Sequence, residues 1–331
     1  METNRRIVLR QRPVGVLTWD DVELEEVPLP ELAPGEALVR AELLGMDATV
    51  RSWLNEADGY LPPVEIGEVI RCAGNGTVVA TKSDAFAVGD VVTTLTGMQD
   101  FVVVRDDVFS NRFPPGTAIA PLLSVYGSPG MTAYVGLVDI GRATAGETVV
   151  VSAAAGATGS LVGQIGKILG CRVVGIAGTD DKCRFVVEEL GFDACINYRT
   201  DDIAARLKEL APKVDVYFDN VGGPILDAVL RRINQGGRVV LCGAISAYNE
   251  TEKPPGPANY INLISRRASM QGFIALDHWG RFAEIQERLS RWVDDGELRP
   301  VEQYYEGLES SIDALNALFT GANVGKVIVR L

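Results

Sequence analysis

The stretch Thr148-Val149-Val150-Val151-Ser152, followed by Ala155-Gly156-Ala157-Thr158-Gly159, decides the fold of this chain. The first run is rich in β-branched residues and predicts a strand that is buried on both faces. The second run predicts a glycine-rich turn that opens a helix, and another apolar strand follows at residues 172–176. A strand, such a turn and a helix in this order present backbone N–H groups where a pyrophosphate can bind. The stretch therefore predicts a dinucleotide-binding fold.

Glycines also serve ordinary strand-to-helix turns, so the interpretation depends on the residues after the turn. Short apolar strands are predicted at residues 194–197, 214–218 and 238–241, with helices at 201–210 and 225–233 between them. This spacing is typical of βαβ units around a parallel sheet. The context favours a doubly wound, Rossmann-type domain over an isolated turn.

The end of the second predicted strand indicates which dinucleotide binds. An NAD site usually carries an Asp or Glu about 20 residues past the glycines. Here the strand closes on Ile176-Ala177-Gly178, and Lys182 follows. A neutral turn with a lysine accepts a 2′-phosphate, so NADP(H) is favoured over NAD(H), although Asp180 and Asp181 lie in the same turn. The alternative for Lys182 is an ordinary surface lysine.

Composition narrows the class of protein. The chain has 331 residues, of which 47% are hydrophobic, enough for two domains with sizeable cores. Its net charge is −13 and it has no lysine- or arginine-rich run, so nucleic acid and membrane surfaces are not expected as partners. Five cysteines without a CxxC pair indicate reduced thiols, and the first dozen residues lack the apolar core of a signal peptide. A cytoplasmic protein is expected.

The first part of the chain has a different pattern from the cofactor domain. Short strands separated by turns are predicted at residues 37–44, 64–71, 76–80, 90–94 and 100–104. An amphipathic helix at residues 280–293 precedes a tail that becomes strand-like again at 327–330. We therefore predict an α/β protein with a discontinuous β domain for substrate, residues 1–125 and 295–331, and an inserted cofactor domain, residues 126–294.

A catalytic zinc ion needs three protein ligands from Cys, His and carboxylate side chains. The chain has one histidine, His278, and Cys72 is the one cysteine in the first domain. We therefore expect no metal site of the alcohol dehydrogenase type. His278 is interpreted as a surface or interdomain residue.

Several motifs along nearly the whole chain resemble those of one known family. They are Gly67-Glu68-Val69, Gly89-Asp90-Val91, Gly130-Met131-Thr132-Ala133-Tyr134, Ala153-Ala154-Ala155-Gly156-Ala157-Thr158-Gly159-Ser160, Asn197-Tyr198, Phe218-Asp219-Asn220-Val221-Gly222-Gly223, Cys242-Gly243-Ala244-Ile245-Ser246-Ala247-Tyr248-Asn249 and Asn323-Val324-Gly325-Lys326. In this order they resemble the medium-chain dehydrogenase/reductase superfamily, in its zinc-independent branch of prostaglandin (leukotriene) reductases and alkenal and curcumin reductases. The resemblance implies a GroES-like β domain, NADP(H) as cofactor and a homodimer.

The resemblance also implies roles for individual residues. Lys182 and Tyr198 would contact the 2′-phosphate side of NADP, and Tyr248 would face the substrate carbonyl. The remaining cofactor contacts would come from Ala155, Gly156, Ala157, Thr158, Gly159, Gly178, Asn220, Cys242, Gly243, Ile245, Ser246, Asn323 and Gly325. One segment departs from the family, because Asp47-Ala48-Thr49-Val50-Arg51 stands where relatives tend to carry Asp-Pro-Tyr-Met-Arg.

The residue types favour conjugate reduction of a small-molecule enone or enal. Without zinc, hydrogen-bond donors must stabilise the enolate oxygen that forms when hydride adds to the β-carbon. Tyr248 is the leading donor, with a ribose hydroxyl of the cofactor as its partner; the alternative is that Tyr248 only packs in the cleft. Quinone reduction and a low-turnover NADPH-binding sensor or structural protein are the alternative functions, because the cofactor motifs would be the same in each.

Overall fold

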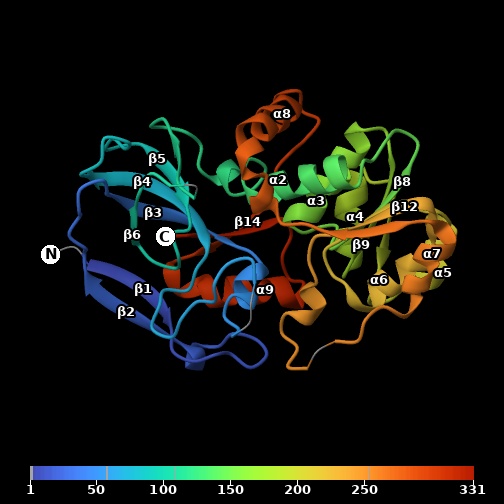
Figure 1. Cartoon of the computed structure of the whole chain (residues 1–331), viewed down its shortest axis with the longest axis horizontal. Coiled ribbons are helices and arrows are strands. Elements are labelled where there is room, and N and C mark those ends of the chain that lie inside the picture. The colour runs from blue at the N-terminus through green and yellow to red at the C-terminus, as the bar shows by residue number, and fades with distance from the viewer. Residues whose placement is uncertain (1–2, 57–58, 108, 253) are drawn as a thin grey trace. The chain divides into compact units, whose positions relative to one another are not determined.

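The structure, a computed structural model, describes residues 3–56, 59–107, 109–252 and 254–331 (Figure 1). The chain forms two compact units. Unit 1 comprises Met1–Leu123 and Glu302–Leu331, and unit 2 comprises Ser124–Val301. No helix in the described ranges is long and apolar enough to cross a lipid bilayer.

Unit 2 is built on a six-stranded parallel sheet with the order β10-β9-β8-β11-β12-β13. The strands are β8 (Thr148–Ser152), β9 (Arg172–Ala177), β10 (Ala194–Asn197), β11 (Val214–Asp219), β12 (Ile233–Leu241) and β13 (Ser269–Gly272). The chain runs from β8 outward to β10 on one side and continues from β11 to β13 on the other. The order therefore reverses between β8 and β11, and ligands bind at such a reversal in doubly wound sheets.

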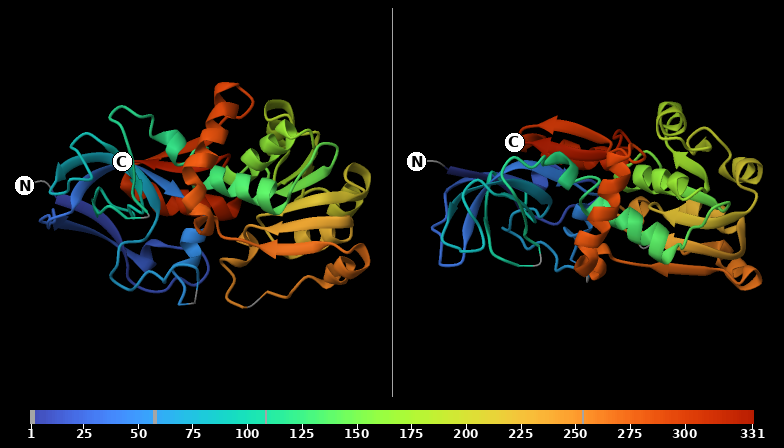
Figure 2. Two further views of the ribbon diagram at one scale, coloured as in Figure 1. Left: turned by 45° about the horizontal axis from the view of Figure 1, so that its top comes forward. Right: turned by 90° about the horizontal axis from the view of Figure 1, so that it is seen from above.

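Helices cover both faces of this sheet, as both views in Figure 2 show. Val149 and Val151 belong to a core that includes residues of α2 (Ser128–Tyr134), α3 (Ala157–Ile168) and α8 (Phe282–Asp294). Val150 belongs to a second core, with residues of α5 (Ile203–Leu210) and α6 (Gly223–Leu230). Successive valines face opposite sides because side chains alternate along a strand. The shorter elements are α4 (Asp180–Arg184), α7 (Asn262–Arg266), π-helical turns at Val135–Ile140 and Phe185–Glu189, and 3₁₀ turns at Ile245–Ala247, Ala258–Ile261 and Ala275–Arg281.

Unit 1 is a β unit that contains both ends of the chain. A seven-stranded sheet has the order β14-β15-β3-β4-β5-β7, with β6 paired to β3, and β1 and β2 form a separate antiparallel pair. The strands are β1 (Thr3–Leu9), β2 (Val22–Pro28), β3 (Ala37–Met46), β4 (Ala73–Thr81), β5 (Val91–Thr94), β6 (Phe101–Val104), β7 (Asn111–Phe113), β14 (Glu302–Glu306) and β15 (Lys326–Arg330). Helices α1 (Thr49–Ser52) and α9 (Ser311–Thr320) and 3₁₀ turns at Trp19–Asp21, Ala120–Leu122 and Leu308–Ser310 complete it.

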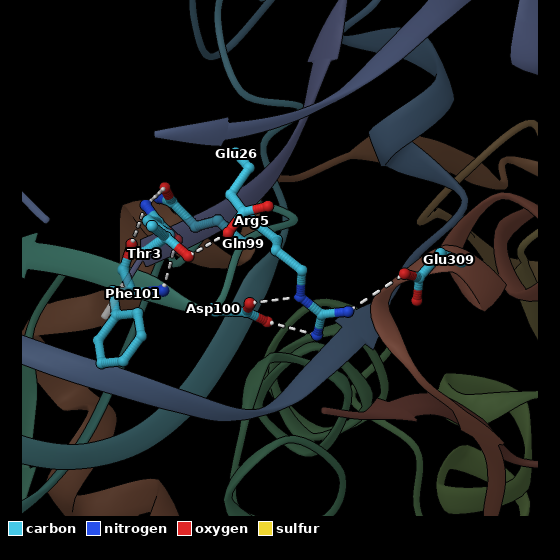
Figure 3. A network of polar contacts seen from close by, with 8 residues as sticks. Thr3, Arg5, Glu26, Gln99, Asp100, Phe101 and Glu309 are labelled. Atoms are coloured by element: carbon cyan, nitrogen blue, oxygen red, sulfur yellow. Dashed lines mark hydrogen bonds and ion pairs between the residues drawn. The ribbon is translucent and has the colours of Figure 1, made fainter. Parts of the chain in front are cut away.

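The returning C-terminal segment is joined to the N-terminal strand inside unit 1. Figure 3 shows Arg5 of β1 between two carboxylates, Asp100 before β6 and Glu309 before α9. Arg5 Nε donates to Asp100 at 2.8 Å, and Arg5 Nη1 donates to Glu309 at 3.1 Å. Because β15 also pairs antiparallel with β3, residues far apart in the sequence share one sheet. The predicted α/β class, with a discontinuous β part and a doubly wound part, is confirmed.

One predicted strand is wrong. Residues 64–71 form a turn with a single bridge from Val69 to Val8, because Gly67 has φ +89° and the Glu68 carboxylate accepts from the Glu65 N–H. The strand at residues 238–241 lies inside the sheet, since β13 pairs with β12 on its outer side. β13 is the edge.

Candidate cofactor-binding and active site

The glycine turn after β8 is shaped for close approach between helix α3 and the strand end. A Cβ atom at Gly159 would lie 2.3 Å from the carbonyl oxygen of Ala153, so only glycine fits there. Ala153 itself has φ +50°, in the left-handed region. Gly156 is the N-cap of α3, and the first N–H groups of a helix have no partner within it. Gly156, Ala157, Thr158 and Gly159 thus form a turn at the N-terminus of α3, a position at which anions commonly bind, and the preceding Ala155 is buried.

Two polar strand ends meet where the strand order reverses. Ser152 ends β8 and Asp219 ends β11, and both are fully buried. Asn220 donates to Ser152 twice, from its backbone N–H to the hydroxyl at 2.9 Å and from its side-chain amide to the carbonyl at 2.7 Å. The Asn220 side chain is therefore held above the carboxyl ends of both strands.

The Asp219 carboxylate organises the loop between β11 and α6. Its Oδ1 accepts hydrogen bonds from the Tyr217 hydroxyl at 2.8 Å, the Ser152 hydroxyl at 3.1 Å and the backbone N–H groups of Val221 and Gly222 at 3.0 and 2.9 Å. Its Oδ2 is buried and makes no protein hydrogen bond among the described residues. A dense set of donors on one carboxylate fixes this loop in a single conformation.

The segment after β12 packs on the same loop. Cys242 and Gly243 donate their backbone N–H groups to the Asp219 carbonyl at 2.9 and 3.1 Å. Ile245 N–H donates to the Asn220 carbonyl at 3.2 Å, and the Ser246 hydroxyl donates to the Val221 carbonyl at 2.6 Å. The predicted residues Asn220, Cys242, Gly243, Ile245 and Ser246 are therefore brought together at the reversal point.

Tyr248 folds back over this segment. Its hydroxyl oxygen accepts from the Ala244 N–H at 3.1 Å, and a Cβ at Gly243 would lie 3.2 Å from it. Burial raises the Tyr248 pKa above its ordinary value, and the nearby Cys242 and Asp219 raise it further, against the opposing Ala244 hydrogen bond. The phenol therefore stays protonated at neutral pH, and its own proton is available for donation. Burial likewise raises the pKa of the Cys242 thiol to about 12.

A second polar group forms where β9 and β10 end. Burial lowers the pKa of Lys182, and repulsion from the positive charge of Arg199 lowers it further. The Tyr198 side chain, 40% exposed, covers Gly178, because a Cβ there would lie 3.1 Å from its ring and its hydroxyl. Lys182, Arg199 and Tyr198 are therefore candidate residues for binding a dianionic group.

The two acidic residues of this turn have partners. Asp180 accepts from the Asn197 amide at 2.7 Å, and Asp181 pairs with Arg184. The Asp181 carboxylate is therefore paired with a cation, whereas Asp180 is hydrogen-bonded by a neutral amide and keeps its negative charge.

The remaining predicted residues, Asn323 and Gly325, lie in unit 1. The Asn323 amide donates to the Gly325 carbonyl at 3.2 Å, and Gly325 has φ +70°, so the pair shapes the turn before β15. The next residue, Lys326, is 1% exposed and pairs with Asp47, while its ammonium also donates to the Met46 carbonyl at 3.1 Å. A role for Asn323 at the cofactor stays a prediction.

Metal-ligating residue types do not cluster in the described ranges. No group of three or more His, Cys, Asp or Glu side chains there could hold a metal ion. His278 lies in the 3₁₀ turn Ala275–Arg281 and is partly exposed.

Comparison with known proteins identifies the family. Residues 5–111 match the family described as the N-terminal domain of oxidoreductase, and residues 157–293 match the one described as zinc-binding dehydrogenase. The NADPH-dependent curcumin reductase of Escherichia coli is 39% identical over 100% of this chain and 97% of its own length. This chain belongs to the medium-chain dehydrogenase/reductase superfamily, in its alkenal and curcumin reductase branch.

Other members of this branch match equally completely. Prostaglandin reductase 1 of Bos taurus is 38% identical over 97% of both chains. The crystal structure of CurA from Vibrio vulnificus in complex with NADPH superposes with a TM-score of 0.94, at 40% identity and 98% coverage of both chains. The predicted family, including a GroES-like β domain and a Rossmann-type domain, is confirmed.

Three residues of the site were not predicted as site residues from the sequence. Ser152 and Asp219 are polar residues at the ends of two apolar strands, and this pattern was the available signal. It indicates a site only once β8 and β11 are known to be neighbours in the sheet. Arg199 follows Tyr198 directly, and its basic side chain was the available signal. Its position near the end of β9 depends on β10 lying beside β9.

Proposed function

We propose that this protein reduces the C=C bond of α,β-unsaturated ketones and aldehydes with NADPH, without a metal ion. The observation that carries the proposal is the similarity, from end to end, to the NADPH-dependent curcumin reductase of Escherichia coli. When bound, NADPH supplies the hydride that adds to the β-carbon of the substrate. The residues of the chain bind the cofactor, orient the substrate and stabilise charge on its carbonyl oxygen.

Cofactor binding is assigned to the residues of unit 2. The turn at Gly156–Gly159 would hold the pyrophosphate, because Gly159 allows α3 to approach the strand end and leave its N-terminal N–H groups exposed to the ligand. Lys182, Arg199 and Tyr198 would hold the 2′-phosphate. The loops around Asn220 and Cys242 would line the nicotinamide half. These three sets of residues suit the pyrophosphate, the 2′-phosphate and the nicotinamide of NADPH, which supports a phosphorylated dinucleotide as the cofactor.

Tyr248 is assigned as the donor to the substrate oxygen. As hydride adds to the β-carbon, negative charge develops on that oxygen and needs a hydrogen-bond donor. Burial keeps the Tyr248 phenol protonated, and its oxygen already accepts from the Ala244 N–H, which orients the hydroxyl. The proton for the α-carbon comes from water in this proposal.

The two units are assigned different tasks. We assign residues 1–125 and 295–331 to substrate binding and residues 126–294 to the cofactor, with Asn323 and Gly325 as cofactor contacts from the returning segment. The compact units divide at Ser124 and Glu302, which is compatible with this assignment. The free thiols of all five cysteines favour a cytoplasmic location.

A homodimer is proposed through the β13 edge of unit 2. The outer side of β13 has no paired strand in the described sheet, and the segment that precedes β13 in the chain carries exposed Tyr260, Ile261 and Ile264, at 58%, 62% and 74%. Two copies related by a twofold axis can pair such edges antiparallel and cover these side chains. An Ile264→Glu variant should shift the mass measured by light scattering from dimer to monomer, and an unchanged mass would exclude this interface.

The function is tested by following NADPH absorbance with a panel of enones, enals and quinones. NADH replaces NADPH in one control, and a chelator is added in another. Chelator-resistant, NADPH-selective reduction of the enones and enals is expected. Faster turnover of quinones would favour the quinone reductase alternative, and tight NADPH binding without turnover would favour a sensor.

A further inference from the structure

One arginine of unit 1 is half-buried and has no carboxylate partner in the described ranges. Arg71 lies just before β4, and its Nη1 donates to the Pro62 carbonyl at 2.8 Å. The Glu68 carboxylate, three residues earlier, accepts instead from the Glu65 N–H at 3.0 Å. The guanidinium therefore keeps N–H donors that no described carboxylate binds.

The charge of Arg71 is not fully compensated where it lies. Burial lowers the Arg71 pKa below its ordinary value, and the nearby Glu68 and Tyr60 oppose this effect only in part. Burial of a cation is unfavourable unless an anion or several acceptors offset the lost hydration. A carboxylate on a ligand would offset it well, because its two oxygens match the planar fork of a guanidinium.

An aromatic ring fixes the position of the guanidinium. The Arg71 Cζ atom lies 5.4 Å from the centre of the Trp53 ring, which is within the range of a cation–π contact. The Tyr60 ring meets Trp53 edge-on, with 6.0 Å between the ring centres. A group that is already held in place loses little conformational freedom when it binds an anion.

These side chains adjoin the 47–51 segment of unit 1, the unit that the proposed function assigns to substrate. Trp53 is the C-cap residue of α1, and the Tyr60 hydroxyl lies 2.8 Å from the hydroxyl of Thr49 within that segment. Printed contacts thus connect Thr49 to Tyr60, Tyr60 to Trp53 and Trp53 to Arg71.

We propose that Arg71 binds a carboxylate at the far end of the substrate, so that the preferred substrates are enones and enals with a carboxylate remote from the C=C bond. This inference deepens the proposed function and rests on it for the identity of the reacting bond. Binding of the carboxylate itself needs no turnover and can be tested separately.

The kinetic test compares the acid and the methyl ester of the same enone. A series of compounds varies the chain length between the C=C bond and the carboxyl group. At the best length we expect kcat/KM for the acid to exceed that for the ester by about tenfold, mainly through KM. Because the net charge of the chain is −13, the molecule as a whole does not attract acids, so this preference would report a local contact. A ratio of one or below at every length would overturn the proposal.

Variants locate the preference at Arg71. Arg71→Gln should bring the acid-to-ester ratio close to one. Arg71→Lys, which also serves if the glutamine variant folds poorly, should give an intermediate ratio, since an ammonium has charge but no fork. Arg40→Gln, on an exposed arginine of β3, changes the net charge equally and should retain the ratio. A preference that survives Arg71→Gln would trace it to another residue.

Binding without turnover is followed by NMR of the tryptophan indole N–H groups. The chain has four tryptophans, and Trp53→Phe identifies the Trp53 signal. Hexanoate should shift this signal in the wild type and leave it unchanged in Arg71→Gln, whereas the neutral 1-hexanol should not shift it in either. No shift at any hexanoate concentration that the protein tolerates would contradict a carboxylate site beside Trp53.

The two tests separate this inference from the proposed function. If no enone or enal is reduced, the proposed function fails, and the hexanoate experiment still decides whether Arg71 binds a carboxylate. If hexanoate binds but acids and esters react equally at every chain length, Arg71 does not contact the substrate and the inference is wrong.

Discussion

The glycine turn of unit 2 and the 47–51 segment of unit 1 differ in how many residue types their backbones tolerate. In the turn, a single added carbon at Gly159 would meet a backbone oxygen at 2.3 Å. In the segment, Thr49 and Val50 stand where related reductases tend to carry a tyrosine and a methionine, and the helix α1 still forms. The turn geometry admits only glycine at residue 159, whereas α1 forms with a threonine and a valine at residues 49 and 50.

The segment in unit 1 keeps its position through residues that flank the changed ones. Arg51 is 3% exposed and donates to the Gly15 and Pro13 carbonyls at 2.8 and 3.0 Å, and Asp47 pairs with the buried Lys326. Between these anchors, the Thr49 hydroxyl is 2.8 Å from the Tyr60 hydroxyl. The anchors allow Thr49 to vary without loss of the fold.

The largest effect is expected from Gly159→Ala. The Cβ clash with Ala153 forces α3 away from the turn, and an overpacking cost of about 3 kcal/mol corresponds to an affinity loss of about a hundredfold. NADPH binding measured by calorimetry checks this. Gly280→Ala is the matched control, because a Cβ there meets no atom within 4 Å. If Gly159→Ala binds NADPH within a few-fold of the wild-type affinity, residue 159 tolerates a side chain and the two regions do not differ in this respect.

Tyr248→Phe should lower turnover by about tenfold to a thousandfold, because it removes the donor to the developing oxyanion. The KM for NADPH should change little, and circular dichroism checks that the Ala244 contact is not needed for folding. Tyr260→Phe, on an exposed tyrosine, is the control. The raised Tyr248 pKa also predicts wild-type turnover that does not fall until the pH passes about 10, where an ordinary phenol ionises. Unchanged turnover in Tyr248→Phe would assign the donor elsewhere.

Lys182→Ala should raise the KM for NADPH about tenfold and leave the KM for NADH nearly unchanged. In the proposed site, the lost ammonium would contact the 2′-phosphate, a group that only NADPH carries. Lys208→Ala, on an exposed lysine of α5, controls for the change in net charge. Equal losses with both cofactors would remove Lys182 from the phosphate site.

The smallest effect is expected from Thr49→Tyr. A larger side chain beside Tyr60 should change the ratio of kcat/KM between small and bulky enones by about two- to tenfold. The KM for NADPH should be unaffected, since Thr49 belongs to unit 1. If all substrates change by the same factor, the segment does not determine specificity.

The sequence predicted unit 2 better than unit 1 for a physical reason. The buried parallel strands are continuous apolar runs, and the predicted bounds of β8 and β10 agree with the structure. The predicted strand at 64–71 had equally suitable residues, but Gly67 and the Glu65–Glu68 hydrogen bond fold it into a turn. Local propensity could not reveal that competition.

At the candidate site, the sequence predicted the residues that belong to motifs and missed those that depend on tertiary contacts. The glycines and Lys182 follow one strand and its turn, so their order along the chain was sufficient. Arg199 follows β10, which pairs with β9, while Asp180 accepts a hydrogen bond from Asn197 and Asp181 pairs with Arg184. These contacts depend on the order of strands in the sheet, which cannot be predicted from neighbouring residues in the sequence.

The most direct test of the proposed reaction is the position of deuterium in the product. Each of the two forms of NADPH that carry deuterium at one face of the nicotinamide C4 is supplied with a small enone, and the product is analysed by NMR. Conjugate reduction places deuterium on the carbon β to the carbonyl with one of the two forms. Deuterium on the carbonyl carbon, which gives an allylic alcohol, would contradict the proposed function.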